Sequence, residues 1–375
     1  MIIKNVRVFK ENGTFETGEI YIQGEKFVEN CTEEQVIDGN GAYAVPGLTD
    51  IHFHGCVGYD FCDGTNEAIK VMAEYELENG ITAICPATMT LGEDTLTDIA
   101  NAAASYDSAT GADLVGINME GPFISMEKKG AQNPAYIHKP DAEMFRRLQK
   151  ASGNLFKLCA IAPEEEGAID FIKELKDEVV LSVAHTKADF DIAQKAFEAG
   201  ARQVTHLYNA MNSFTHRAPG VIGAACDNDN VKVELICDGV HVHPSVIRTT
   251  FKMFGDDRIV MISDSMMATG KPDGIYSLGG QSVTVKGNLA TLTEGGAIAG
   301  SATNLMNCVR FAVKTAGIPL ESAIKCAAVN SAKAIGIYDK YGSITPGKYA
   351  NVVLLDEDLN IEKIIKRGTI VNKVH

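Results

Sequence analysis

The sequence contains no tryptophan, and only 7% of its 375 residues are aromatic. No apolar run approaches the ~18 residues of a membrane-spanning helix, and the N-terminus lacks the long apolar core typical of a signal peptide. The nine cysteines are scattered without a CxxC pair, which argues against a disulfide framework or a zinc ribbon. These absences predict a cytoplasmic protein with reduced thiols and no membrane partner.

Basic residues are scarce: 34 Lys and Arg stand against 49 Asp and Glu, which gives a formal net charge of −15. Nucleic acids and anionic membranes are bound by basic faces, so the composition argues against both as partners. An anionic small substrate is compatible with this charge only where a local basic pocket receives it. The 45% hydrophobic and 22% charged composition is otherwise ordinary for a globular protein.

Repeats and phosphate-binding turns are also missing. No period recurs along the chain, and neither GxGxxG nor GxxxxGK[ST] follows an early candidate strand. The length corresponds to about two and a half domains of ~150 residues. It fits equally well one barrel of ~250 residues with a small satellite domain.

Eight short apolar runs alternate with helical patterns in the middle of the chain. The runs cover residues 47–54, 81–88, 114–120, 156–162, 179–185, 203–206, 232–238 and 258–264. Apolar strands with helices between them indicate a parallel sheet covered by helices. Eight such units predict an α/β fold with a (β/α)8 TIM-type barrel over residues 47–339. A doubly wound sheet is the alternative, and the missing phosphate turn disfavours it.

The periodicity predicts further elements within and around this barrel. Helices are expected at 66–78, 188–199 and 302–315, and a hairpin insertion at 275–292. Both ends of the chain consist of short alternating strands with Gly and Asn between them, and neither carries enough apolar surface to fold alone. We therefore predict one small β-sandwich domain built from residues 1–46 and 340–375.

Polar residues close several of the apolar runs, at the end of the strands where a barrel carries its active site. His52 and His54 close the first run and share one face, because alternate strand residues point the same way. The later runs end in Glu120, His185, His206 and Asp264. A lone histidine is more often a satisfied structural group, but this set comes from five strands. Imidazole and carboxylate ligands without thiolate suit Zn, Fe, Mn or Co in an open catalytic site.

Such a site predicts hydrolysis. A divalent metal lowers the pKa of bound water toward ~7 and polarises a substrate carbonyl. One carboxylate then takes the proton from that water and passes it to the leaving group. Asp264 is the best candidate, because the last strand faces the first-strand ligands across barrel closure.

Longer motifs extend this interpretation. They are PGLTDIHFHG, MEGPF, KGAQNP, AHT, THLYNAM, HRAPG, DGVHV, ISDSM, IAGS and GSITPGKYANVVLLD, between residues 46 and 356. With them the sequence resembles the metal-dependent amidohydrolases, and more narrowly the N-acetylglucosamine-6-phosphate deacetylase family, over nearly the whole chain. The resemblance implies a barrel with a small β domain, a homodimer, and hydrolysis of N-acetylglucosamine 6-phosphate to glucosamine 6-phosphate and acetate. It places the chain in amino-sugar catabolism and cell-wall sugar recycling.

The resemblance also implies residue roles. Glu120, His185 and His206 would hold the main metal, with Asp264 as acid and base at the same centre. The sugar pocket would be lined by Ala131, Gln132, Asn209, Ala210, Ala299, Gly300 and Ser301. Phosphate would be bound by Arg217 and by His241, which lies beside Asp238 in the DGVH turn. In the family that arginine reaches into the neighbouring subunit's site, so the dimer would be needed for activity.

Family members differ at two positions, and this chain makes a consistent pair of choices. Some have lost the first-strand histidines and carry a histidine where Gln132 stands here. Because His52 and His54 are both present, we expect two divalent ions per subunit, with Glu120 as the bridge. The fourth strand ends without the lysine that bridges two metals in many other amidohydrolases.

Three other functions compete with this one. Another amidohydrolase, acting on a cyclic amide or as an aminohydrolase, would not require the phosphate pair Arg217 and His241. A non-catalytic scaffold on the same barrel would have lost metal ligands, and here the full set is present. Deacetylation of N-acetylgalactosamine 6-phosphate is a close variant, because loop contacts decide sugar stereochemistry at one carbon.

Overall fold

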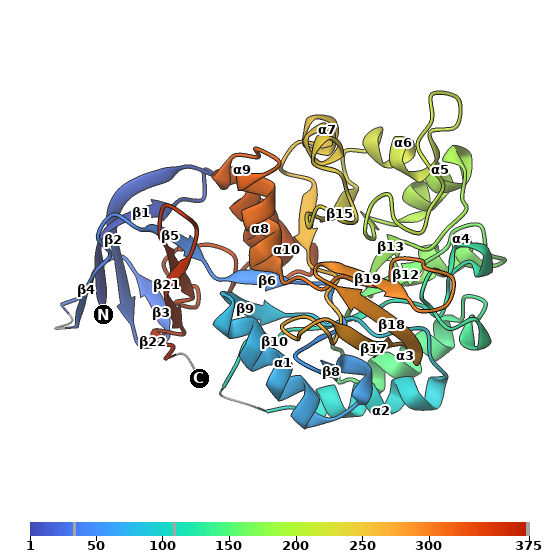
Figure 1. Cartoon of the computed structure of the whole chain (residues 1–375), viewed down its shortest axis with the longest axis horizontal. Coiled ribbons are helices and arrows are strands. Elements are labelled where there is room, and N and C mark those ends of the chain that lie inside the picture. Colours follow the sequence, from blue (N-terminus) through green and yellow to red (C-terminus); the bar gives the residue numbers. More distant parts are fainter. Residues whose placement is uncertain (33–34, 108–109, 373–375) are drawn as a thin grey trace.

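The structure is a computed structural model that describes residues 1–32, 35–107 and 110–372. A small β-sheet lies at one end of the molecule, and a larger part with helices packed around a curled parallel sheet makes up the rest (Figure 1). Among the described residues, no helix is long and apolar enough to cross a membrane.

Both ends of the chain contribute to the small sheet. Its order is β22-β21-β20-β5-β1-β2-β3, with β4 beside β1. The strands are β1 (Ile2–Phe9), β2 (Phe15–Gln23), β3 (Lys26–Val28), β4 (Val36–Asp38), β5 (Tyr43–Pro46), β20 (Val352–Leu355), β21 (Ile361–Lys366) and β22 (Thr369–Ile370). Antiparallel pairing of Val45 with Val353 joins the two ends. The strands pair into one sheet, and a bridge from Lys26 to Tyr349 shows that it curls back on itself.

The central strands are all parallel and lie in two segments, β6-β9-β10 and β11 to β16. They are β6 (Leu48–Asp50), β9 (Ile81–Ile84), β10 (Asp113–Leu114), β11 (Ile117–Met119), β12 (Phe156–Ile161), β13 (Val180–Val183), β14 (Gln203–Val204), β15 (Lys232–Ile236) and β16 (Ile259–Ile262). Each of the eight predicted runs contains at least one of them. Their order follows the chain without reversal, whereas a doubly wound sheet reverses at a switch point.

Hydrogen bonds beyond the named strands connect these segments. Between β9 and β11, Asn118 pairs with Ala87, and its N–H donates to the carbonyl of Pro86 at 2.9 Å. Between the first and the last strand, the Asp264 N–H donates to the His52 carbonyl at 2.9 Å, and the His54 N–H to the Ser265 carbonyl at 2.7 Å. The curl therefore brings the carboxyl ends of β6 and β16 together.

Helices follow most of the parallel strands (Figure 1). They are α1 (Asn66–Glu78), α2 (Glu93–Ser105), α3 (Ala142–Ala151), α4 (Ala168–Leu175), α5 (Phe190–Ala199), α6 (Gly220–Cys226), α7 (Pro244–Phe254), α8 (Leu305–Lys314), α9 (Leu320–Ile324) and α10 (Asn330–Ala334). Helix α1 has the predicted bounds. Helices α5 and α8 begin later than predicted, because Asp189 and Asn304 act as N-caps and accept backbone N–H bonds.

The predicted hairpin insertion has a third strand. It is a small antiparallel sheet of β17 (Gly274–Leu278), β18 (Gln281–Lys286) and β19 (Leu289–Leu292), and a short ribbon of β7 (Gly55–Cys56) and β8 (Tyr59–Asp60) follows the first strand. Gln281 donates a side-chain hydrogen bond to the carbonyl of Ala131. The insertion thereby packs against the loop that was expected to line the substrate pocket.

Candidate active site

The structure brings the six predicted metal and acid residues together. They are His52 and His54 after β6, Glu120 after β11, His185 after β13, His206 after β14 and Asp264 after β16. All six residues are buried. Two groups are close enough to hold a metal ion, namely His52, His54 and Glu120, and Glu120, His185 and His206.

Glu120 stands at the centre of this cluster. Its Oε1 lies 3.1 Å from His185 Nε2 and 3.0 Å from His206 Nε2. Its Oε2 lies 3.2 Å from His54 Nε2, and His52 Nε2 is 3.5 Å from Oε1. One carboxylate thus faces four imidazole nitrogens, which is the arrangement expected of a group that bridges two ion positions.

The donor set fits a cation. The Nδ1 of His185 lies 2.8 Å from the carbonyl oxygen of Lys128, which can only accept, so Nδ1 carries the ring proton. In the neutral ring, the Nε2 lone pair then points at a carboxylate oxygen 3.1 Å away. Two acceptors face each other favourably only around a positive charge. Neutral imidazoles and a carboxylate, without thiolate, are ligands for Zn, Fe, Mn or Co.

Electrostatics agree with this chemistry. Burial lowers the pKa of His54, but the hydrogen bonds to Asp264 and Glu120 outweigh it and raise that pKa to about 10. Burial likewise opposes the charged form of His52, and the carboxylates of Glu234 and Glu120 raise its pKa well above the ordinary value. The pocket of acidic groups therefore attracts positive charge strongly.

Asp264 is placed to act on a proton beside this cluster. Its Oδ1 lies 3.3 Å from His54 Nε2 and 3.8 Å from His52 Nε2. Burial would raise the pKa of Asp264, but the His54 hydrogen bond and the charges of both histidines lower it below the ordinary value. The carboxylate is therefore ionised and able to accept a proton.

Three of these residues have left-handed backbones. The φ angles are 43° at His185, 28° at His206 and 50° at Asp264, a region that costs non-glycine residues about 1–3 kcal/mol. Hydrogen bonds hold the Asp264 bend, since its carbonyl accepts the Ser301 N–H at 2.7 Å. The bends turn the side chains at the strand ends toward the cluster.

Gln132 lies against the bridging carboxylate. Its Nε2 donates to Glu120 Oε2 at 2.6 Å, and its Oε1 accepts the Thr90 N–H at 2.6 Å. The sequence predicted substrate contact for Gln132. Its observed bonds hold the orientation of Glu120.

A cavity of about 300 Å³ opens onto the cluster, at the lower end of the range for ligand pockets. Of the predicted substrate residues, it is lined by Ala131, Gln132, Asn209, Ala210, His241 and Gly300. Leu278 and Ile298, from the insertion and the segment after it, add apolar surface. Among the described lining residues there is no Lys or Arg, so one chain alone offers this cavity no permanent cation.

Four predicted substrate residues do not line the cavity. Ala299 and Ser301 are fully buried beside Gly300, and the Ser301 hydroxyl donates to the Ser263 carbonyl at 2.6 Å. Asp238 accepts the His241 Nδ1–H at 2.7 Å and so orients that ring. Arg217 is exposed on the loop before α6, outside the cavity of its own chain.

Burial lowers the pKa of His241, but the carboxylate of Asp238 outweighs it and raises that pKa. His241 lines the cavity, and its raised pKa favours the protonated ring, which donates hydrogen bonds.

One residue of the site was missed. Glu234 lies in the middle of β15, fully buried, and its Oε2 is 2.8 Å from His52 Nδ1. The signal in the sequence is an acidic residue in the middle of the run 232–238, between the apolar residues Val233 and Leu235.

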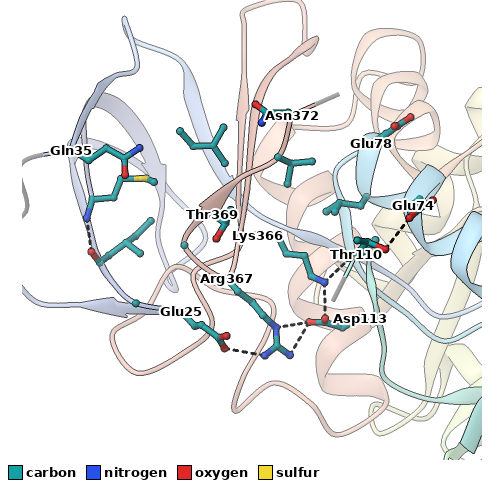
Figure 2. Close-up of a pocket in the computed structure, with 18 of the residues that line it drawn as sticks. Glu25, Gln35, Glu74, Glu78, Thr110, Asp113, Lys366, Arg367, Thr369 and Asn372 are labelled. Carbon is teal, nitrogen blue, oxygen red and sulfur yellow. Dashed lines mark hydrogen bonds and ion pairs between the residues drawn. The ribbon is translucent and has the colours of Figure 1, made fainter. Parts of the chain in front are cut away.

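A larger cavity, of about 980 Å³, lies between the small sheet and α1 (Figure 2). Lys366 and Arg367 point into it, but both already pair with Asp113, at 2.8 Å and 3.1 Å. Arg367 also pairs with Glu25 at 3.1 Å. The cations of this larger cavity are neutralised, and neither metal-ligating group of the described residues lies there. The chemistry therefore belongs to the smaller cavity.

Comparison with known proteins identifies the family. The sequence model described as "Amidohydrolase family" matches residues 43–371.

The chain belongs to the amidohydrolase family.

Related proteins match this sequence over most or nearly all of the chain. N-acetylglucosamine-6-phosphate deacetylase of Bacillus subtilis (strain 168) is 36% identical, covering 99% of this chain and 96% of that protein. N-acetylgalactosamine-6-phosphate deacetylase of Escherichia coli O157:H7 is 32% identical, covering 87% of each. The resemblance that the motifs predicted, and the expectation of a hydrolase, are confirmed.

A solved structure is similar as well. It is an aspartate-to-alanine mutant of N-acetyl-D-glucosamine-6-phosphate deacetylase from Mycobacterium smegmatis in complex with N-acetyl-D-glucosamine-6-phosphate. The two chains superimpose with a TM-score of 0.90 at 30% identity, covering 99% of this chain and 98% of that one.

Proposed function

We propose that the protein hydrolyses the acetamide of N-acetylglucosamine 6-phosphate to glucosamine 6-phosphate and acetate, in amino-sugar catabolism and cell-wall sugar recycling. One observation carries the proposal: two triads that share Glu120 lie beside a buried, ionised Asp264 at a small cavity. The full-length similarity to the Bacillus subtilis enzyme supports the choice of substrate.

Two divalent ions would be held by this chain. His185 and His206 would hold one and His52 and His54 the other, with Glu120 shared and Asp264 close to the second. Zn, Fe, Mn and Co all suit these ligands. When bound, such ions supply Lewis-acid activation of water and of the amide carbonyl.

Asp264 moves the proton. Its carboxylate takes one proton from the water that attacks the carbonyl carbon, and it then gives that proton to the amide nitrogen as the C–N bond breaks. The nitrogen leaves as the free amine of the sugar. The acetic acid formed loses its remaining acidic proton to solvent and leaves as acetate. Gln132 keeps Glu120 in place during these steps.

The phosphate requires a cation, and the described residues that line the cavity include no Lys or Arg. Arg217 would supply it from the partner of a homodimer, since this residue is exposed and lies outside its own cavity. A guanidinium fork binds two phosphate oxygens at once, and a lysine does not reproduce that geometry. His241, held by Asp238, would donate a further hydrogen bond.

The same proposal includes the domain plan. Residues 47–339 would form a closed (β/α)8 barrel, supported by the hydrogen bonds from Asp264 to His52 and from His54 to Ser265. Residues 1–46 and 340–375 would form the small domain, a sandwich made by one sheet that curls back.

The metal content tests the two-ion site. Full-length protein purified without chelators is expected to carry about two equivalents of divalent metal, by analogy with other bridged sites. His52→Ala is expected to reduce this to about one, as measured by elemental analysis. His138→Ala, an exposed histidine outside the cluster, serves as the control. A wild-type content of one that His52→Ala leaves unchanged would refute the two-ion site.

Acetate release tests the reaction. N-acetylglucosamine and N-acetylgalactosamine are assayed with and without the 6-phosphate, and the phosphorylated glucosamine derivative is expected to react fastest. Faster release from the galactosamine 6-phosphate would favour the second candidate, which the Escherichia coli relative supports. Equal rates with and without phosphate, or hydrolysis of only a neutral cyclic amide, would contradict the proposal.

A further inference from the structure

Glu234 lies on β15, in the seventh predicted run, and links this run to the first and the sixth. Its Oε2 lies 2.8 Å from His52 Nδ1 and accepts the backbone N–H of His206 at 3.1 Å. Its Oε1 accepts a hydrogen bond from Gln203 Nε2 at 2.6 Å. The carboxylate is fully buried and makes no ion pair with Lys or Arg in the part of the chain that the structure describes.

A buried carboxylate is costly without compensation, and neighbouring core positions of β15 are occupied by the apolar residues Leu235 and Ile236. Packing therefore does not explain an acidic side chain here. Its contacts with two predicted ligands, one through a ring and one through a backbone N–H, point to the metal centre instead.

We propose that Glu234 is the positioning residue of the metal centre, which directs His52 Nε2 toward Glu120 and thereby sets the ion affinity of the His52, His54 and Glu120 group. The inference rests on the two-ion site of the proposed function. Carboxylates that hold the second nitrogen of a ligand histidine have this effect in metal sites generally.

The geometry assigns the tautomer. Because the Glu234 carboxylate accepts, His52 Nδ1 carries a proton, so Nε2 is the nitrogen that would give up its proton and offer a lone pair to an ion. That Nε2 is buried and has no hydrogen-bond partner among the described residues, so it is left free for a ligand bond. Among the described residues, a carboxylate faces Nδ1 of His52, whereas a backbone carbonyl faces Nδ1 of His185.

The test measures ion affinity without substrate. Zn²⁺-loaded, full-length protein is titrated with a chelator of known affinity, and the retained zinc is counted. Glu234→Gln keeps the size and the acceptor for the His206 N–H but removes the charge beside His52. One of the two ions is expected to bind about 10–100-fold more weakly, the usual effect of removing such a carboxylate. The other ion is expected to keep its affinity within a few fold.

Two further variants separate positioning from structural damage. Gln203→Met removes a neighbouring bond of the same carboxylate and leaves the His52 contact, so both ion affinities are expected to stay near wild type. The exchange Q203E/E234Q keeps one buried carboxylate but moves it away from His52, and the weaker ion is again expected to lose affinity. Wild-type ion affinities in this exchange variant would overturn the inference.

A double-mutant comparison completes the test. In a His52→Ala background, Glu234→Gln is expected to change the remaining ion affinity little, because the two residues act together. If Glu234→Gln weakened the ion held by His185 and His206 equally in the wild-type and the His52→Ala backgrounds, the inference would be overturned. A wild-type protein that binds one ion would also overturn it. Acetate release by the wild type decides the proposed reaction separately, since the titration contains no substrate.

Discussion

Asp264→Asn is expected to lower kcat for acetate release by a factor of about 10²–10⁴, the usual contribution of a positioned acid and base. The asparagine keeps the size of the side chain but cannot accept the proton from water. Metal content is expected to remain near wild type, because the Glu120 and histidine ligands are intact. Steady-state kinetics and elemental analysis of the same preparation measure both quantities.

The control for this variant is Asp170→Asn, which changes an aspartate that is 87% exposed on α4. It is expected to leave kcat unchanged. Should Asp264→Asn retain more than about a tenth of wild-type kcat, another group would be the base. Loss of metal together with activity would instead assign Asp264 mainly to ion binding.

Arg217→Ala is expected to raise KM for the 6-phosphate substrate by about 10–100-fold. The reason is the loss of one or two charge-assisted hydrogen bonds of about 1.5–3 kcal/mol each, where each 1.4 kcal/mol is about tenfold. Activity on the unphosphorylated sugar is expected to start low and change little. Arg147→Ala, a surface arginine paired with Glu93, serves as the control.

The same arginine allows a test of the dimer. Mixing Arg217→Ala with Asp264→Asn protein is expected to restore activity, because a mixed dimer holds one site with both residues intact. Without exchange of Arg217 between subunits, neither site of a mixed dimer would be complete and no activity would return. An equal weakening of phosphorylated and unphosphorylated substrates by Arg217→Ala would remove the phosphate role.

Local patterns predicted much of this protein. The eight apolar runs each contain a parallel strand, and α1 has the predicted bounds, because burial on both faces of a strand and a 3.6-residue helical period leave marks in consecutive residues. His52, His54 and Asp264 were identifiable because each closes such a run. The starts of α5 and α8 were predicted a few residues too early. The capping side chains of Asp189 and Asn304 decide where these helices begin, and the hydrophobic period does not mark that position.

Glu234 and Gln132 are the counterexamples. His52 and Glu234 are 182 positions apart, and Gln132 lies in a loop. No local hydrophobic period therefore predicts the contact of Glu234 with His52 or that of Gln132 with Glu120. The same holds for the small sheet, where alternation predicted the strands but only the pairing showed that both ends of the chain join in one curled sheet.

The ends of the strands, and the polar residues that close them, were thus predictable from the sequence alone, because they depend on neighbours in sequence. The tertiary structure alone decided which nitrogen of His52 faces Glu120, which predicted residues line the cavity, and that one chain brings it no Lys or Arg among the described residues. These properties depend on distances between distant segments, and the curl of the sheet sets those distances.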